Sequence, residues 1–194
     1  MNYIKNLFLF FIAITLISAC TKDTMPDQNE EEMAEELTES MTWTYNGEEK
    51  TATAFLGESW TSSGGTDFET RRLYIEAQDA SGERIKVTMI NALDLGDGEC
   101  PVLMTYQVGI DDQDCGQSEG GYSFCQEGRI SLLKSNKAYN DQDKSGEVIL
   151  TSCIVEDKLA TGTFRGSVER TLDDGTVDIL EISGEFKNIE FVKL

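Results

Sequence analysis

Acidic side chains are the most abundant groups in this sequence that could do chemistry. The 194 residues contain 36 Asp and Glu, 16 Lys and Arg, and no His. The absence of His excludes Ser-His-Asp and Cys-His nucleophilic catalysis, and no Gly-rich phosphate loop follows an expected strand. Two carboxylates at a set separation would suffice for a glycosidase, but the acids are too numerous for a pair to be chosen. The sequence therefore assigns no catalytic residue.

One acidic segment is spaced like the start of a calcium loop. Asp141, Asp143 and Ser145 stand at alternate positions and Gly146 follows, as in loops that place oxygen ligands before a sharp turn. The position that should supply a bidentate Glu is Ser152, and no helix is expected beside it. We therefore interpret the segment as a polar hairpin loop, with calcium at Asp141, Asp143 and Ser145 as the alternative.

Trp60 is the aromatic residue whose position most suggests a ligand. It lies in a Gly- and Ser-rich stretch, residues 57–65, where a loop is expected and a large ring is not. Such a ring can stack against a sugar or cover the end of a barrel or sandwich. Trp43 follows an alternating strand pattern instead and is expected in the core.

The first twenty residues have the three zones of an export signal. A polar start with Lys5 precedes an apolar run from Leu7 to Leu16, which is shorter than the roughly 20 residues that span a bilayer. Ile17-Ser18-Ala19-Cys20 resembles the lipobox of bacterial lipoproteins. The resemblance implies cleavage before Cys20 and acylation of its thiol, which would anchor the chain durably to a membrane. An ordinary secretory signal with a coincidental cysteine is the alternative.

Four further cysteines, Cys100, Cys115, Cys125 and Cys153, form an even set. In an exported protein this predicts two disulfides, and four cysteines allow three connectivities. We favour Cys115 with Cys125, which flank a flexible loop, and Cys100 with Cys153. Zinc is the alternative, but neither a C-x-x-C spacing nor a His supports it.

An acidic segment, residues 20–40, follows the signal, residues 1–19. Its acids repel one another and its apolar residues are few, which predicts a disordered tether. Removal of the signal takes away Lys5 and no acid, so the net charge changes from −20 to −21. A charge of this size argues against binding to nucleic acid or to anionic headgroups.

From Met41 onward, apolar and polar residues alternate with the period of a β-strand. Asn46-Gly47, Ser81-Gly82 and Asp173-Asp174-Gly175 mark hairpin turns. Because no segment shows helical spacing, residues 41–194 are expected to form one all-β domain, an antiparallel β-sandwich or a small flattened barrel. Strands are expected over residues 41–45, 51–56, 72–77, 85–89, 129–134, 148–155, 161–169, 177–182 and 186–194.

Two copies of a Gly-x-Phe motif, Gly162-Thr163-Phe164 and Gly184-Glu185-Phe186, occur near the C-terminus. Glycine in a strand marks a bulge or a close backbone approach, and the Phe two residues later would point inward. Together with the lipobox, the acidic tether and an opening Trp43-x-x-Asn46-Gly47 hairpin, these motifs resemble a family of small Bacteroidota lipoproteins with a single β-rich domain of unknown function. The resemblance implies a β-rich fold and a location in the cell envelope. It implies no activity and no catalytic residues.

These features together predict a lipid-anchored lipoprotein of the cell envelope. Thr21, rather than Asp, follows Cys20, which by the sorting rule of lipoproteins implies the outer membrane and leaves the periplasmic and cell-surface faces open. We expect a non-enzymatic binding or accessory domain without a cofactor other than the lipid on Cys20. Its partners would be the bilayer and either an outer-membrane protein or a glycan. The alternatives are a carbohydrate-active enzyme that uses Asp and Glu, and a structural subunit of an outer-membrane assembly.

Overall fold

The structure is a computed structural model in which residues 38–63, 69–92, 100–101, 103–109, 116–117, 123–124 and 126–194 are described. The described residues all belong to one compact unit, Leu37–Leu194. The predicted signal, the lipidation site Cys20, most of the predicted tether, and the predicted disulfide partners Cys115 and Cys125 lie outside the described residues.

Strands account for the regular structure of the described residues, which confirms the predicted all-β class. These residues contain no helix, and so none that is long and apolar enough to cross a membrane. Two short strands, β6 (Gly116–Gln117) and β7 (Ser123–Phe124), pair only with each other. The remaining strands are β1 (Ser40–Tyr45), β2 (Glu48–Ser63), β3 (Glu69–Asp79), β4 (Arg84–Ala92), β5 (Thr105–Val108), β8 (Gln126–Lys134), β9 (Lys137–Ile154), β10 (Leu159–Thr171), β11 (Val177–Glu190) and β12 (Val192–Lys193).

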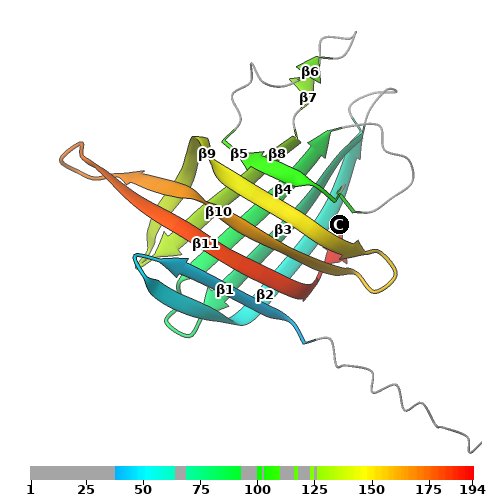
Figure 1. Ribbon diagram of the computed structural model, residues 1–194, viewed down its shortest axis with the longest axis horizontal. Helices are drawn as coiled ribbons and strands as arrows, with labels where there is room; N and C mark the ends of the chain where they lie inside the picture. The colour runs from blue at the N-terminus through cyan, green and yellow to red at the C-terminus, as the bar shows by residue number, and fades with distance from the viewer. Residues whose placement is uncertain are drawn as a thin grey trace, which may run out of the picture. The chain divides into compact units, whose positions relative to one another are not determined.

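The main sheet closes on itself into a flattened barrel. Its strand order is β1-β11-β10-β9-β5-β8-β4-β3-β2-β12, and β1 also pairs with β2. One layer holds β1, β11, β10 and β9, and the other holds β8, β4, β3 and β2 (Figure 1). Between the layers, β5 separates β8 from β9 at one end, whereas those two strands pair directly at the other. Pairing is antiparallel except for β5 with β8 and β12 with β2.

Tight turns connect four pairs of consecutive strands: β1 with β2, β3 with β4, β8 with β9, and β10 with β11. Asn46 and Gly47 have φ values of 51° and 76°, which suit the primed hairpin turns favoured by the twist of paired strands. Gly82 and Gly175 also have positive φ, at 86° and 83°, so the three turns predicted from Gly are confirmed. A fourth turn with the same character, at Ser135-Asn136, was not predicted.

Alternate residues of the strands fill the barrel with side chains. The largest of these belong to Trp43, Tyr45, Tyr106, Phe186 and Phe191, and none is more than 2% exposed. Trp43 is therefore a core residue, as predicted. Burial of apolar surface on this scale is the main force that holds the two layers together.

The two Gly-x-Phe motifs form reciprocal pairs across β10 and β11. Gly162 lies opposite Phe186, and Phe164 lies opposite Gly184. A Cβ added to Gly162 would stand 2.5 Å from Cζ of Phe186, and one added to Gly184 would stand 2.4 Å from Cζ of Phe164. Each ring thus covers the glycine of the neighbouring strand, which explains why the motif occurs twice.

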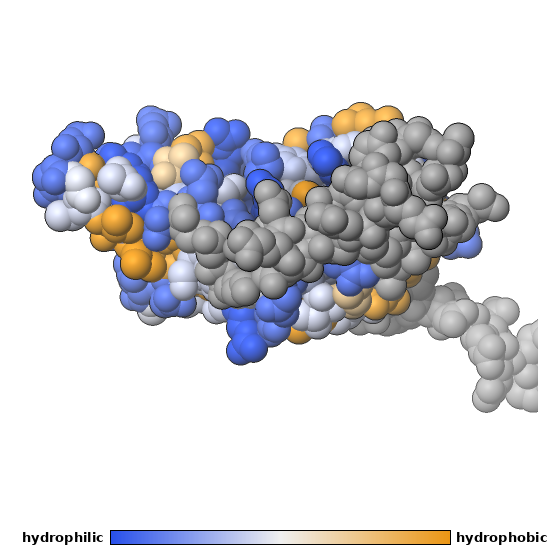
Figure 2. Space-filling view, turned by 90° about the horizontal axis from the view of Figure 1, so that it is seen from above, coloured by the Kyte–Doolittle hydropathy of each residue, from blue (hydrophilic) through white to orange (hydrophobic). Residues whose placement is uncertain are grey.

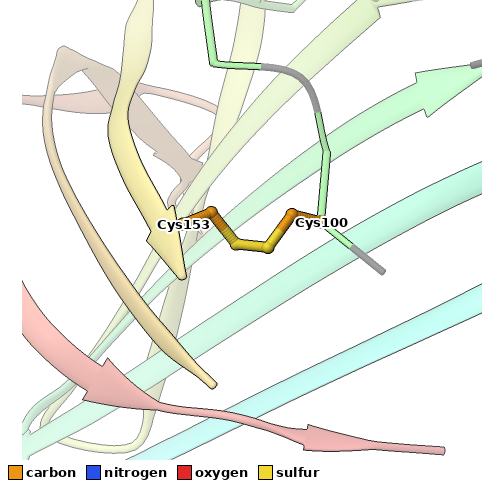
Figure 3. Close-up of a disulfide and its surroundings, with 2 residues drawn as sticks. All are labelled: Cys100 and Cys153. Carbon is orange, nitrogen blue, oxygen red and sulfur yellow. A yellow bond between two sulfur atoms is a disulfide. The ribbon is translucent and has the colours of Figure 1, made fainter. Parts of the chain in front are cut away.

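A disulfide joins Cys100, which precedes β5, to Cys153 in β9 (Figure 3). The two Cα atoms are 6.1 Å apart, within the usual range for a disulfide. The predicted Cys100–Cys153 pairing is therefore confirmed.

Three strand predictions were wrong. Residues 141–146 belong to β9 rather than to a hairpin loop, because the chain turns earlier, at Ser135-Asn136. Residues 177–190 form one strand, β11, because Gly184 remains extended between Trp43 of β1 and Phe164 of β10. The short β5 was not predicted, since only Tyr106 and Val108 of its four residues are buried.

Candidate functional site

A groove crosses the outer face of β2, β3, β4 and β8. Its volume is about 660 Å³, within the range of ligand sites. We call it the ring-and-cation groove because aromatic and basic side chains stand together in it. It is lined by Trp60, Arg72, Tyr74, Lys86, Thr88, Ile90, Gly109, Glu127, Arg129, Ser131, Asn140 and Asp141.

The strand register brings these residues together from distant parts of the sequence. One row across the four strands reads Trp60, Arg72, Ile90 and Glu127. The next outward-facing row reads Glu58, Tyr74, Thr88 and Arg129. Because side chains alternate between the faces of a sheet, neighbours within each row point to the same side.

Two basic side chains of the groove lie over aromatic rings. The guanidinium carbon of Arg72 is 6.0 Å from the ring centroid of Trp60, and Nζ of Lys86 is 4.4 Å from that of Tyr74. These distances are typical of cation–π contacts. Nε of Arg72 is buried and has no hydrogen-bond acceptor among the described residues.

The expected loop around Trp60 is not formed. Residues 57–63 continue β2, and Trp60 is half-buried on its outer face opposite Arg72. The predicted ligand residue is therefore a strand residue on the side of the barrel, rather than a lid over its end. Its role in ligand binding stays a prediction.

Carboxylates modify the electrostatics of the groove. Glu127 accepts hydrogen bonds from Nε and an Nη of Arg129 at 2.8 and 3.2 Å, so this ion pair is bidentate. Burial raises the pKa of Tyr74, and the hydrogen bond that its hydroxyl donates to Glu76 raises it further. Burial likewise raises the pKa of Asp141, which favours the protonated acid.

The residues of the predicted calcium site do not share one pocket. Asp141 lines the ring-and-cation groove, whereas Ser145 lines a groove on the opposite layer. The side chain of Asp143 lies outside the described residues. Within the described part of the chain, no three Asp, Glu, Cys or His side chains form a group that could hold a metal ion. Calcium binding stays a prediction, but residues 141–146 do not form the loop from which it was inferred.

The groove on the opposite layer differs in its chemistry. It is larger, about 790 Å³, and Gly146 and Gly166 lie among its lining residues. Several charged and hydroxyl groups in and beside it pair with one another: Arg165 with Glu147 at 2.8 Å, and Ser167 with Glu181 at 2.7 Å. The buried Oγ of Ser145, by contrast, has no hydrogen-bond partner among the described residues. We call this surface of β1, β11, β10 and β9 the hydroxyl face.

An apolar patch is visible at the left end of Figure 2, where the β10–β11 hairpin projects in Figure 1. The exposed apolar residues of that hairpin are Val177 and Ile179, at 49% and 56% exposure. They lie beyond Ile182, the last residue of β11 that pairs with β1, so this stretch of β11 is an edge. Two apolar side chains on an edge do not specify a ligand.

A buried polar row was missed by the sequence reasoning. Arg71 and Asn91 are direct cross-strand neighbours and are 3% and 0% exposed. Tyr106 is also fully buried, and burial raises its pKa to about 12, opposed by its side-chain contact with Asn91. The available signal was Arg71 itself, which stands at an inward position of an alternating strand.

The ring-and-cation groove thus brings two cation–π pairs into one accessible volume. The hydroxyl face is largely self-paired, and the Arg71 row lies inside the barrel. Comparisons with protein families, with curated proteins and with solved structures find no match to this chain.

Proposed function

We propose that this chain is a lipid-anchored binding domain of the outer membrane that captures a glycan in the ring-and-cation groove without turning it over. The observation that carries the proposal is the cluster of Trp60, Tyr74, Arg72 and Lys86 on one open face of a rigid sheet. Rings provide flat apolar area at low entropic cost, and the polar groups around them fix a ligand's orientation.

The sequence supports the parts of the proposal that concern acylation of Cys20 and location at a membrane. Acylation of Cys20 in the lipobox-like Ile17-Ser18-Ala19-Cys20 would attach the chain to a membrane. The acidic segment that follows would be a flexible linker between the membrane and the β-domain. Fatty-acid labelling of the full chain checks this part: label should be incorporated by the parent and not by Cys20→Ser. Labelling of the variant would refute the anchor without affecting the groove.

Binding is tested on a glycan array with the full chain and two variants. Trp60→Ala should weaken binding about tenfold, which corresponds to roughly 1.4 kcal/mol of lost aromatic contact. Thr163→Ala is the matched control, because Thr163 is an exposed residue in a strand of the hydroxyl face. Equal binding by all three proteins would contradict the groove as the site.

One observation favours a second function, a glycosidase. Glu127 and Asp141 line the same groove, and burial raises the pKa of Asp141, as expected of a general acid. Release of reducing sugar by the parent, lost in Asp141→Asn, would establish the enzyme. Stable binding with no released sugar would favour the binding domain.

A further inference from the structure

Two of the three basic residues that line the ring-and-cation groove form no ion pair with a carboxylate of the described residues. The sequence has 36 acids for 16 basic residues, so most exposed cations should find a carboxylate. Arg84, Arg129, Arg165 and Lys187 do so, with ion pairs of 2.8 to 3.2 Å. Arg72 and Lys86 instead contact the rings of Trp60 and Tyr74, and no carboxylate among the described residues forms an ion pair with either.

A cation held over a ring keeps its charge and its hydrogen-bond donors. Contact with an aromatic face positions the group but consumes none of its N–H donors. In Arg72 one donor, Nε, is buried and has no acceptor within the described part of the chain. A buried donor without a partner costs free energy, and an anionic oxygen would remove this cost.

The negative charge of the whole protein does not prevent an anion from binding here. At physiological ionic strength, charges farther away than about 8 Å are largely screened. The potential felt by a ligand in the groove is therefore set by its nearest groups. Among these, Arg129 pairs with Glu127, and Glu76, the cross-strand neighbour of Lys86, pairs with Arg84. The cross-strand neighbours of Arg72, which are Trp60 and Ile90, are uncharged. Asp141 also lines the groove, and burial raises its pKa, which favours the protonated acid.

The separation of the two cations suits an extended ligand. Arg72 lies opposite Ile90 in β4, four residues from Lys86, so the backbone positions are roughly 14 Å apart. Tyr74 and Thr88 lie between them, and Ser131 and Asn140 add further hydrogen-bonding groups. Hydroxyl and amide groups beside a ring are the partners of a sugar, and Ile90 is the one aliphatic side chain of the lining.

We propose that the ring-and-cation groove selects an acidic oligosaccharide, with one carboxylate or sulfate group on Arg72 and a second toward Lys86. The inference rests on the proposed function and narrows its ligand class. The guanidinium of Arg72 can hold either anion through two parallel hydrogen bonds.

The test is isothermal titration of the full chain with oligomers of equal length. The probes are oligogalacturonate, a chondroitin sulfate oligomer, neutral galacto-oligosaccharide and a poly-glutamate peptide. At least one acidic sugar should bind with a Kd at least tenfold lower than the neutral sugar, and rising salt should weaken it. Arg72→Gln and Lys86→Gln should each weaken binding of the acidic sugar about tenfold more than binding of the neutral one.

Arg165→Gln is the matched control, since it removes the same charge from the hydroxyl face. An equal loss in this variant would attribute the effect to net charge and overturn the inference. Equal affinity for neutral and acidic sugars, both weakened by Trp60→Ala, would overturn the inference and leave the proposed function standing. Absence of binding to any sugar would overturn both, and equally tight binding of the peptide would overturn a sugar-selective groove. Thermal melting of each variant confirms that the fold is retained.

Discussion

The ring-and-cation groove and the hydroxyl face lie on opposite layers of one barrel, and their polar side chains have different kinds of partner. On the hydroxyl face, Arg165 pairs with Glu147, and Ser167 pairs with Glu181. In the groove, Arg72 and Lys86 rest on rings and keep their donors available. A surface whose polar groups satisfy one another contributes to the fold, whereas one with available donors can gain from a ligand.

Close-packed glycines occur in both layers but are more numerous in the strands of the hydroxyl face. Gly146, Gly162, Gly166 and Gly184 belong to those strands, where bare backbone lets neighbouring strands and the Phe rings approach closely. On the groove layer, Gly57 of β2 and Gly128 of β8 have such close neighbours. The comparison suggests that changes to the hydroxyl face alter stability and that changes to the groove alter binding.

The largest expected effect concerns the disulfide beside the boundary between the layers. It joins Cys100, before β5, to Cys153 of β9, at a sequence separation of 53. Chain-entropy arithmetic for this loop predicts that Cys100→Ser combined with Cys153→Ser lowers the free energy of unfolding by about 4 kcal/mol. Urea denaturation measures this loss.

Hydrogen exchange in the same double variant tests the comparison itself. Amides of β5 and β9 should exchange faster, while those of β3 and β4 under the groove stay protected. The pair Cys115→Ser with Cys125→Ser is the control, because it leaves the Cys100–Cys153 bond in place. A uniform rise in exchange across both layers would contradict separate roles for them.

A smaller loss of stability is expected when a methyl group is added to Gly184, in a strand of the hydroxyl face. In Gly184→Ala, the new Cβ would lie 2.3 Å from the carbonyl oxygen of Thr42 and 2.4 Å from Cζ of Phe164. Since backbone cannot give way cheaply, we expect a loss of about 3 kcal/mol in the free energy of unfolding. Glycan binding by the folded fraction should not change.

Gly166→Ala is the matched control for that substitution. Its new Cβ would meet Ser145 O at 3.0 Å and Gly146 Cα at 3.3 Å, so smaller shifts would relieve the contacts. The loss should be clearly less than in Gly184→Ala, as measured by the same urea titration. Equal losses would show that close backbone approach does not explain Gly184.

Local patterns predicted the hairpins and most strands, because turn chemistry and side-chain alternation act over a few residues. Asn46-Gly47 and the alternation around Trp43 are examples. Closure of the barrel was beyond such reasoning, since β1 must pair with both β2 and β11, and β11 lies far away in sequence. No local signal reports that pairing.

The sequence did not predict the ring-and-cation groove, because the second half of β2 does not have the residue pattern of a strand. Residues 57–63 lack the apolar alternation of a strand because Gly57 and Ser59 occupy inward positions beneath the C-terminal segment. A Cβ on Gly57 would lie 2.9 Å from Cα of Phe191, so this position requires glycine. The stretch therefore resembled a loop, and Trp60 could not be aligned with Arg72. Alternation within each strand places Arg72 and Lys86 on the outer face, but it does not report which strands are neighbours.

The smallest expected effects come from two carboxylates whose pKa values shift in opposite directions. Burial raises the pKa of Asp141 in the groove, whereas hydrogen bonds from the hydroxyl and backbone N–H of Thr176 lower the pKa of Asp174 in the β10–β11 turn. The stability linked to Asp141 is complete below the unfolded pKa of about 3.9 and is lost as pH rises through the raised folded value. The stability linked to Asp174 is present above about 3.9 and is lost as pH falls through the lowered folded value.

Asp141→Asn should therefore melt at a higher temperature than the parent at about pH 7, and Asp174→Asn should melt at a lower one. The difference for Asp141→Asn should vanish below the unfolded pKa of about 3.9, whereas that for Asp174→Asn should shrink only as the pH falls through the lowered folded pKa of Asp174. Thermal melting across this range provides the measurement. If the melting temperature of Asp141→Asn exceeded that of the parent by the same amount at every pH, the effect would be due to packing rather than to charge. The groove would then carry no penalty for a buried negative charge, and Asp141 would oppose an acidic ligand with its full charge.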